Sequence, residues 1–332
     1  MRAGHFEVDA VAEGEGTRFA VTAEGKAGSY LLPGGEQKHY RELYKKLSTD
    51  FGTRAPEAHR ERPAAAPASW QPLIAENLGS DILYGYGDPA VLRTGEEYVL
   101  VATSNDAPDA FPILRSTDLE TWEQQGFIFP EGSAPHWTAA GRGVADFWAP
   151  EMARVGEEYW LVYTAREKSG ALAIGLARSA RPFDPWHDLG RPLLSGGVID
   201  PHLFVEQGQP YLFWKQDLNG VWPGLLASLL RSRPELIDLL FDSEEDRRTA
   251  AFGAAVEHWA SGRRPMERFF LMQPLIDAVL DSWGKVRLVL DECEDAAAIV
   301  EAMRTPIRAQ RLASDGDSLL GEPTVVLCND LD

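Results

Sequence analysis

Two aspartates, Asp88 and Asp200, each precede a proline and open a short apolar segment of the chain. The segments read Tyr86-Gly87-Asp88-Pro89-Ala90-Val91-Leu92 and Ile199-Asp200-Pro201-His202-Leu203-Phe204-Val205. Two carboxyl groups that face each other across a pocket can perform acid/base chemistry on a neutral polar substrate. A single Asp-Pro pair is more often a plain turn or strand start, so the two matter only if the fold places them equivalently. The sequence has no Gly-rich phosphate loop, no CxxC or HExxH metal pattern and no GxSxG nucleophile elbow.

The apolar segments are repeats, and a third copy lies between them as Ala149-Pro150-Glu151-Met152-Ala153-Arg154-Val155. In each copy a strand begins at the proline, a polar turn follows, and an aromatic-rich strand returns. Pro89 and Pro150 are separated by the same number of positions as Gly95 and Gly156. Recurrence over whole units of about four strands predicts an all-β fold, and favours a β-propeller over a plain β-sandwich.

The predicted hairpins bring polar and aromatic side chains to the end of the blades where the Asp-Pro pairs lie. Each second strand returns to that end, so the loops that begin at Thr103, Thr164 and Lys215 must surround one mouth, together with the connection that holds His136 and Trp137. Asp88 and Asp200 then face each other across the central opening. Carboxylates beside aromatic faces suit a sugar, whose C–H face stacks while its hydroxyl groups hydrogen bond. The candidate substrate-binding residues are Phe147, Trp148, Arg166, His202, Trp214 and Trp222.

With these motifs the chain resembles glycoside hydrolase family 43, five-bladed propellers that act on arabinofuranosyl and xylosyl linkages. The resemblance covers about residues 80–232 and 305–330, and about three blades of the five. It is carried by Gly87-Asp88-Pro89-Ala90-Val91, Ser116-Thr117-Asp118-Leu119-Glu120-Thr121-Trp122, Phe147-Trp148-Ala149-Pro150-Glu151 and Ile199-Asp200-Pro201-His202-Leu203-Phe204.

The resemblance implies a glycoside hydrolase that cleaves by inversion. Asp88 would be the general base, and Asp200 the aspartate that orients the general acid and raises its pKa. Phe147 and Trp148 would form the pocket wall, and Glu151 would be a structural carboxylate that locks blades together. An oligo- or polysaccharide is the implied substrate.

The general acid of the family is a Glu in the fourth blade, and this sequence shows no residue to match it. Glu206, Glu244, Glu245 and Glu322 do not stand at a strand start of the required kind. The acid is therefore expected beyond residue 332, and the chain by itself is expected to be inactive. Apolar sheet faces at its open ends, such as Val99 to Val101 or Thr324 to Leu327, should be exposed.

Two other functions stay open at this point. A non-catalytic carbohydrate-binding propeller would keep the aromatic pocket without the acid. A related five-bladed fructan-active enzyme would need an aspartate nucleophile and would retain the anomeric configuration.

Composition narrows the partners and the compartment. The net charge of −19 argues against nucleic acid, which is itself a polyanion. Two cysteines are too few for a disulfide framework, and no apolar run is long enough to span a bilayer. The first residues lack the apolar stretch of a secretion signal, which favours a cytoplasmic protein. No cofactor is required, and no pattern indicates a metal, although a structural Ca²⁺ in the central channel would be compatible with the resemblance.

The remaining segments predict three further parts of the chain. Residues 1–53 read as an N-terminal β/α appendage, with short alternating runs up to about residue 32 and a charged helix at about 36–47. Residues 54–79 read as a Pro/Ala-rich linker before the propeller domain, residues 80–332. A helical insertion at 234–305, which contains an N-cap box at Ser243, should interrupt the third blade and pack outside the blades. The segment from Leu225 to Ser232 could also be the third strand of that blade.

Overall fold

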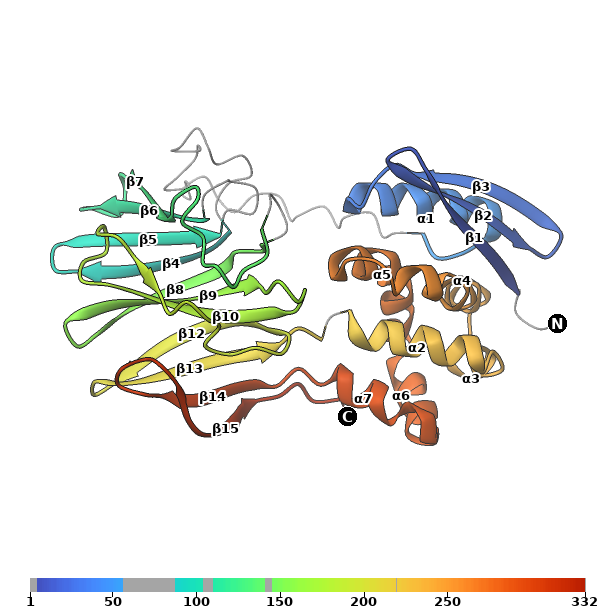
Figure 1. The fold of residues 1–332 in the computed structure, drawn as a ribbon. Coiled ribbons are helices and arrows are strands. Elements are labelled where there is room, and N and C mark those ends of the chain that lie inside the picture. Colours follow the sequence, from blue (N-terminus) through green and yellow to red (C-terminus); the bar gives the residue numbers. More distant parts are fainter. Residues whose placement is uncertain (1–4, 56–86, 104–109, 141–144, 219, 332) are drawn as a thin grey trace. The chain divides into compact units, whose positions relative to one another are not determined.

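Three antiparallel sheets of four strands each form the part of the molecule that carries the Asp-Pro repeats (Figure 1). In this computed structural model the described residues are 5–55, 87–103, 110–140, 145–218 and 220–331. The chain clusters into two units: a helical unit (Met1–Ala64, Leu218–Arg304 and Asp330–Asp332) and a blade unit (Ala65–Asp217 and Thr305–Asn329). Each unit is described by itself.

Each sheet of the blade unit is a meander in which consecutive strands pair. Blade 1 consists of β4 (Gly87–Thr94), β5 (Glu97–Thr103), β6 (Ala110–Ser116) and β7 (Glu123–Phe129). Blade 2 consists of β8 (Trp148–Val155), β9 (Glu158–Arg166), β10 (Leu172–Ser179) and β11 (His187–Asp188). Blade 3 consists of β12 (Val198–Glu206), β13 (Gln209–Gln216), β14 (Ile307–Leu312) and β15 (Leu319–Leu327). The prediction of a mostly β protein built from about three four-stranded blades is confirmed.

Blade 2 is buried on both faces because it lies between the other two. Along β9, Leu161, Tyr163 and Ala165 belong to the core shared with blade 1, whereas Trp160 and Val162 belong to the core shared with blade 3. Successive side chains of a strand point to opposite faces, so a strand covered on both sides reads as a continuous apolar run. The sequence between residues 160 and 165 is such a run, and this explains why it forms the middle of the stack.

The apolar sheet faces expected to be exposed are exposed in one of the two places. Val325, Val326 and Leu327 on β15 are 49–62% exposed, as expected. The expectation for Val99 to Val101 is wrong, because all three are buried: Val99 and Val101 pack in the core that blades 1 and 2 share, and Leu100 packs with Leu114 and Ala102.

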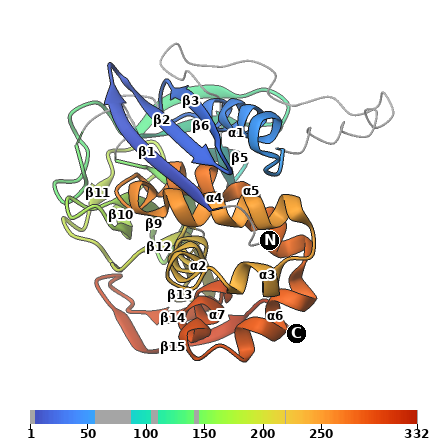
Figure 2. The same ribbon diagram turned by 90° about the vertical axis from the view of Figure 1, so that its right-hand side faces the viewer.

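The helical unit joins the two ends of its sequence in one core (Figure 2). Its N-terminal part is a three-stranded sheet of β1 (Phe6–Glu13), β2 (Gly16–Ala23) and β3 (Lys26–Leu32), followed by α1 (Gln37–Phe51). Its second part consists of α2 (Val221–Ser232), α3 (Leu236–Leu240), α4 (Glu244–Ala260), α5 (Pro265–Asp281), α6 (Trp283–Asp291), a 3₁₀ turn (Glu294–Ala296) and α7 (Ala297–Met303). The predicted cap of α4 is present, since Ser243 Oγ accepts a hydrogen bond from the Asp246 amide.

The sequence assigned the N-terminal segment and the helical insertion to separate parts, but the structure packs them together. The Phe19 ring lies 4.8 Å from Trp259, and the Phe6 and Tyr44 rings lie 5.9 and 5.8 Å from Phe252. Pairing of this kind is not visible in the sequence, because each half has an ordinary amphipathic pattern that does not identify its partner.

The helical insertion also begins earlier than the expected residue 234. The segment from Leu225 to Ser232, which could have been a third strand of its blade, is part of α2. Its buried residues Pro223, Leu226, Ala227, Leu229 and Leu230 follow a helical spacing. The linker expected at 54–79 lies outside the described residues from residue 56 on.

We predict that Gly175→Ala destabilises blade 2. Gly175 on β10 pairs with Tyr163 on β9, and a Cβ at this position would lie 2.3–2.7 Å from the Tyr163 ring and hydroxyl. Such overpacking in a close-packed core costs about 1–3 kcal/mol. Chemical denaturation should detect this loss, while Gly224→Ala on α2, where a Cβ meets nothing within 4 Å, should leave stability unchanged or raise it. Equal stability of Gly175→Ala and the unmodified protein would contradict the packing described here.

Candidate active site

The first strands of the three blades begin with the same unusual backbone. Asp88, Ala149 and Asp200 have φ values of 44°, 44° and 55°, in the left-handed region that non-glycine residues rarely adopt. Each is followed by a proline, and each lies within a register shift against the next strand of its blade. Asp is one of the few residues that tolerates this conformation, and strained positions of this kind often occur at functional sites. The sequence repeat therefore corresponds to a structural repeat at the level of single residues.

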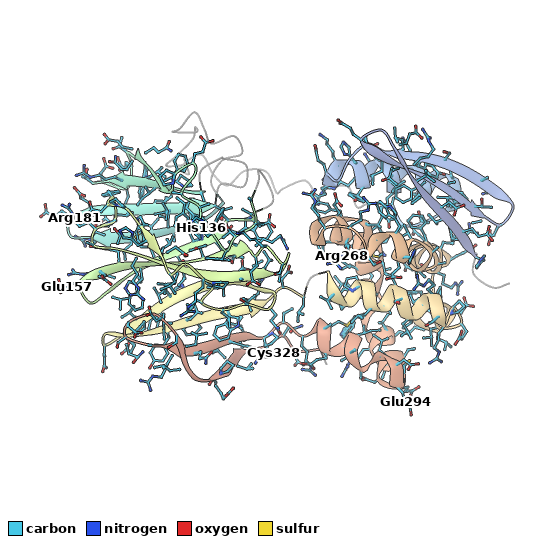
Figure 3. All side chains as sticks on the ribbon, in the orientation of Figure 1. His136, Glu157, Arg181, Arg268, Glu294 and Cys328 are labelled. Atoms are coloured by element: carbon cyan, nitrogen blue, oxygen red, sulfur yellow. The ribbon has the colours of Figure 1, made fainter. Side chains whose placement is uncertain are left out.

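These three strand starts lie at the same end of neighbouring sheets. Strand β8 packs against β4 on one side and β12 on the other, and all three run in the same direction from their starts. Figure 3 labels Glu157, which lies in the turn between β8 and β9 at the opposite edge of the blade unit. Asp88 and Asp200 are thus brought to one edge, with Ala149 of the middle blade between them.

A threonine at the end of each of the first two hairpins fastens the next blade. Thr103, the last residue of β5, accepts a hydrogen bond from the Ala149 amide at 2.8 Å. Thr164 on β9 accepts one from the Asp200 amide at 3.1 Å. The registers place these two threonines equivalently, because Thr103 pairs with Gly87 and Thr164 with Trp148. Both hydroxyls are buried, so neither amide is left without a partner inside the protein.

The two aspartate side chains have different partners. Thr103 Oγ1 donates a hydrogen bond to Asp88 Oδ2 at 2.8 Å. Asp200 Oδ2 instead lies 3.0 Å from Lys215 Nζ, and Lys215 occupies the register position in blade 3 that Thr103 occupies in blade 1. Both aspartates are exposed to solvent and remain accessible to a ligand. Sequence reasoning placed Thr103 and Lys215 only in mouth loops; aligning the blades by the residue opposite each strand start would have singled them out.

Glu151 and His202 form an ion pair between blades 2 and 3. His202 Nδ1 lies 3.3 Å from Glu151 Oε1, and this hydrogen bond raises the pKa of the imidazole above its ordinary value. The His202 ring also lies 6.0 Å from that of Phe213. His202 is two positions after Asp200 and is exposed, so the structure brings it to the candidate site.

Three of the candidate substrate-binding residues lie around the start of β8: Phe147 and Trp148 at the start itself and Arg166 at the end of β9. Phe147 is half-buried and packs against Phe111, Phe129 and Tyr163 at ring distances of 5.6–6.2 Å, and Trp148 is half-buried beside it. The Arg166 guanidinium contacts Asp146 Oδ2 at 2.5 Å and donates to the Gly170 carbonyl at 2.6 Å. Its hydrogen bonds therefore hold the strand start that bears the two aromatic rings, rather than reaching into an open pocket.

Two of the candidate aromatic residues, Trp214 and Trp222, pack against apolar cores. Trp214 is only 5% exposed and packs in the core between blades 2 and 3, because alternation along β13 points it inward. Trp222 lies on α2 of the helical unit and packs against that unit's core. The burial of Trp214 in this core does not support a role for that residue beside the two aspartates.

A buried network in blade 2 has no counterpart in the sequence analysis. Asp188 Oδ2 accepts from the Tyr163 hydroxyl at 2.6 Å, and Asp188 Oδ1 accepts from Trp137 Nε1 at 3.1 Å. Burial raises the pKa of the Asp188 carboxyl, while these hydrogen bonds oppose that shift. The Trp137 ring stacks on that of Tyr163 at 6.2 Å. Trp137, which was expected near the mouth, therefore anchors the connection between blades 1 and 2.

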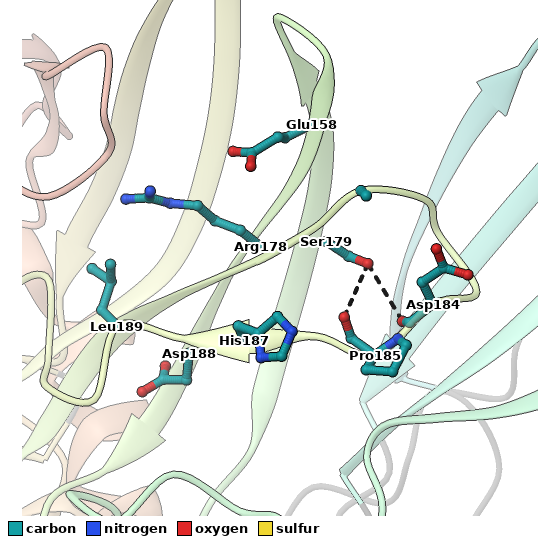
Figure 4. Close-up of a pocket in the computed structure, with 9 residues that line it drawn as sticks. Glu158, Arg178, Ser179, Asp184, Pro185, His187, Asp188 and Leu189 are labelled. Atoms are coloured by element: carbon teal, nitrogen blue, oxygen red, sulfur yellow. Dashed lines mark hydrogen bonds between the residues drawn. The ribbon is translucent and has the colours of Figure 1, made fainter.

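A pocket of about 520 Å³ lies along β10 and β11, away from the aspartates (Figure 4). It is lined by Glu158, Arg178, Ser179, Ala180, Asp184, Pro185, His187, Asp188 and Leu189. Its cation is already engaged, because Arg178 pairs with Asp317 at 2.5 Å and lies over the Trp160 ring. The Ser179 hydroxyl is held by the carbonyls of the turn that follows it. The Arg178 and Ser179 side chains are therefore less available to a ligand than the carboxylates of Asp88 and Asp200.

Among the residues that the structure describes, no group of three or more His, Cys, Asp or Glu side chains is arranged to hold a metal ion. In the same part of the chain, no helix is both long and apolar enough to cross a lipid bilayer.

We predict that the Glu151–His202 pair stabilises the protein only at low pH. Because the pair raises the pKa of His202, its contribution is complete below the ordinary histidine value of about 6.5 and is lost as the pH rises through the raised value. Glu151→Gln should therefore lower stability at pH about 5.5 by up to about 1 kcal/mol, a range typical of partly exposed pairs, and have little effect at pH about 8.5. Chemical denaturation at both pH values tests this, with Glu157→Gln in the β8–β9 turn as the control. A larger effect of Glu151→Gln at the higher pH would refute it.

Part of the chain is similar to known proteins. Residues 82–227 match the family model for glycosyl hydrolases family 43. The chain is 35% identical over 80 residues to xylosidase/arabinosidase 43A of Humicola insolens, which is 24% of this chain and 23% of that protein. It is 28% identical over 174 residues to xylosidase/arabinosidase 43B of the same organism, 50% of this chain and 29% of that protein. The chain thus spans about a quarter of the length of these curated relatives.

Solved structures show weaker similarity over longer stretches. A thermostable family-43 glycoside hydrolase is 22% identical, with 74% of this chain and 54% of that chain covered and a TM-score of 0.44. The endo-arabinase of Bacteroides thetaiotaomicron is 18% identical, with 76% and 60% covered and a TM-score of 0.42. The family-43 model thus matches the segment that carries the Asp-Pro repeats, and the curated relatives that are similar to this chain are named xylosidase/arabinosidases.

Proposed function

We propose that the protein hydrolyses xylosyl or arabinofuranosyl linkages, and that Asp88 is its general base. The observation that carries this proposal is the placement of Asp88 and Asp200 at equivalent left-handed strand starts, at one edge of the stacked blades. Glycoside hydrolysis by inversion needs one carboxylate as general base and a second carboxyl group as general acid. The names of the relatives, both xylosidase/arabinosidases, support the choice of sugar.

Asp88 is suited to activating water. Thr103 holds Asp88 Oδ2, and Oδ1 receives no hydrogen bond from any group in the described residues. A carboxylate that is fixed through one oxygen and free at the other can accept a proton from a water molecule placed against the anomeric carbon. In an inverting enzyme this water lies between the base and the sugar, and the carboxyl groups of the general base and the general acid are about 6.5–9.5 Å apart.

Asp200 has a different role in this proposal. Its carboxylate is bound by Lys215 and its amide by Thr164, so both its backbone and its side chain are fixed. A fixed negative charge near a carboxylic acid raises that acid's pKa and keeps it protonated for the leaving group. We assign no general acid among the described residues.

A non-catalytic carbohydrate-binding function is the second candidate. The half-buried rings of Phe147 and Trp148 next to an exposed carboxylate edge favour it independently of any acid. The two functions differ in turnover rather than in binding, so an assay must measure both.

We expect Asp88→Asn to abolish hydrolysis while leaving sugar binding and fold intact. The amide has the shape of the carboxylate but cannot take a proton from water, and general-base catalysis contributes about 10²–10⁴-fold. Turnover of aryl xylosides and arabinofuranosides, with calorimetric titration of xylose and arabinose, tests this. Asp9→Asn, at an exposed position of β1, is the matched control. Near-normal turnover by Asp88→Asn would remove Asp88 from this role.

The expectation from the sequence that the 332-residue chain is inactive is narrowed here: we expect it to be inactive on natural linkages and to act only on substrates with activated leaving groups. Without an acid, cleavage requires a leaving group that departs as a stable anion, such as 2,4-dinitrophenolate, whereas an alkoxide must be protonated as it leaves. The chain should therefore cleave 2,4-dinitrophenyl xylosides or arabinofuranosides in an Asp88-dependent manner and leave oligosaccharides intact. Release of sugar from oligosaccharides by the chain would show that it contains its own acid. Binding without Asp88-dependent cleavage of either substrate would favour the non-catalytic function.

A further inference from the structure

Thr103 connects the Asp88 carboxylate to the neighbouring blade through one hydroxyl group. The hydroxyl donates to Asp88 Oδ2 and accepts from the Ala149 amide, both at 2.8 Å. Thr103 is only 3% exposed, so little water reaches it to compete for either bond. One oxygen atom thus joins the end of blade 1 to the start of blade 2 and to the proposed base.

The chemistry of the two partners fixes the direction of this hydrogen-bond chain. A backbone amide can only donate, and an ionised carboxylate can only accept. The single hydroxyl proton of Thr103 is therefore not shared between alternatives: it points at Asp88 Oδ2. This directs the hydrogen bond to one carboxylate oxygen and leaves Oδ1 for water.

The other two blades show that this arrangement is specific to blade 1. Thr164 makes the same bond to the next blade, but its own strand start is Ala149, which has no carboxylate to receive a proton. Blade 3 has an aspartate at its start, and the equivalent position there is Lys215, which contacts that carboxylate at 3.0 Å. In each of the two blades that begin with an aspartate, the side chain opposite the strand start thus binds the carboxylate of that aspartate.

We propose that Thr103 is a positioning residue for the reaction: its hydroxyl, oriented by the Ala149 amide, holds the Asp88 carboxylate in the rotamer that presents Oδ1 to the attacking water. This rests on the proposed role of Asp88. Thr103 does not touch the substrate in this proposal, so its effect is on the rate of the chemical step and not on sugar binding.

The test compares Thr103→Val, which keeps the shape and removes the hydroxyl, with Thr103→Ser, which keeps the hydroxyl. On a 2,4-dinitrophenyl glycoside, Thr103→Val should lower kcat about 10- to 100-fold, the range for losing a hydrogen bond to a charged group, with KM changed less than about twofold. Thr103→Ser should restore most of kcat. Thr164→Val is the control for stability. It removes only the equivalent bond to the next blade, so it measures the stability lost when a buried amide has no acceptor.

Crystal structures of the same variants provide a readout that does not depend on turnover. The Asp88 carboxylate should rotate or occupy several rotamers in Thr103→Val and keep one rotamer in Thr103→Ser. The proposal is overturned if this carboxylate stays in place in Thr103→Val, or if Thr103→Ser is as slow as Thr103→Val. It is also overturned if KM rises as much as kcat falls in a folded Thr103→Val protein. Failure of the proposed function looks different, because the unmodified protein and Asp88→Asn would then be equally inactive while the crystal structures still decide the role of Thr103.

Discussion

The site depends on a hydrogen bond from the first residue of one sheet to a threonine at the end of the previous hairpin. This bond uses a backbone amide that the left-handed strand start has turned away from its own ladder. A buried amide without a partner would cost about 1–3 kcal/mol, so the threonine and the left-handed turn stabilise each other. Because the same bond recurs at two junctions, the blades are fixed relative to one another at the edge where the aspartates lie. Apolar packing holds the sheets together over their faces, but it does not by itself determine where their ends align.

Short-range sequence patterns predicted the parts of this edge that repeat. The prolines at 89, 150 and 201 mark the strand starts, the glycines at 95 and 156 mark the turns, and both features were readable without a structure. Asp88 and Asp200 could be singled out because equivalent positions in repeats must occupy equivalent places. Their roles as base and modulator remain proposals.

Side-chain direction and long-range pairing were not predictable in the same way. Trp214 is one residue away in register from pointing toward solvent, and a strand of alternating aromatic residues does not reveal which face is covered. Arg166 was assigned to ligand binding because of its loop, whereas the structure commits its guanidinium to Asp146 and the Gly170 carbonyl. Asp188 had no signal at all, since its partners Tyr163 and Trp137 come from distant parts of the chain.

The shared core of the helical unit has a consequence for the order in which the protein can fold. The strands β1 to β3 leave the ribosome before the blade strands, yet Trp259 and Phe252 on α4, which pack against Phe19 and Phe6, are made only after nearly all of the blade strands. Domains usually fold in order from the N-terminus during synthesis. Here only α1, through Phe51, can pack early against the N-terminal sheet, and the rest of its apolar face must wait while the strands up to β13 complete their hairpins. Strand β14 must then pair with β13, although the whole helical segment separates the two strands in the sequence. A nascent chain of this topology presents part of this sheet to chaperones until α4 has been made, although the same face is buried in the core of the folded helical unit.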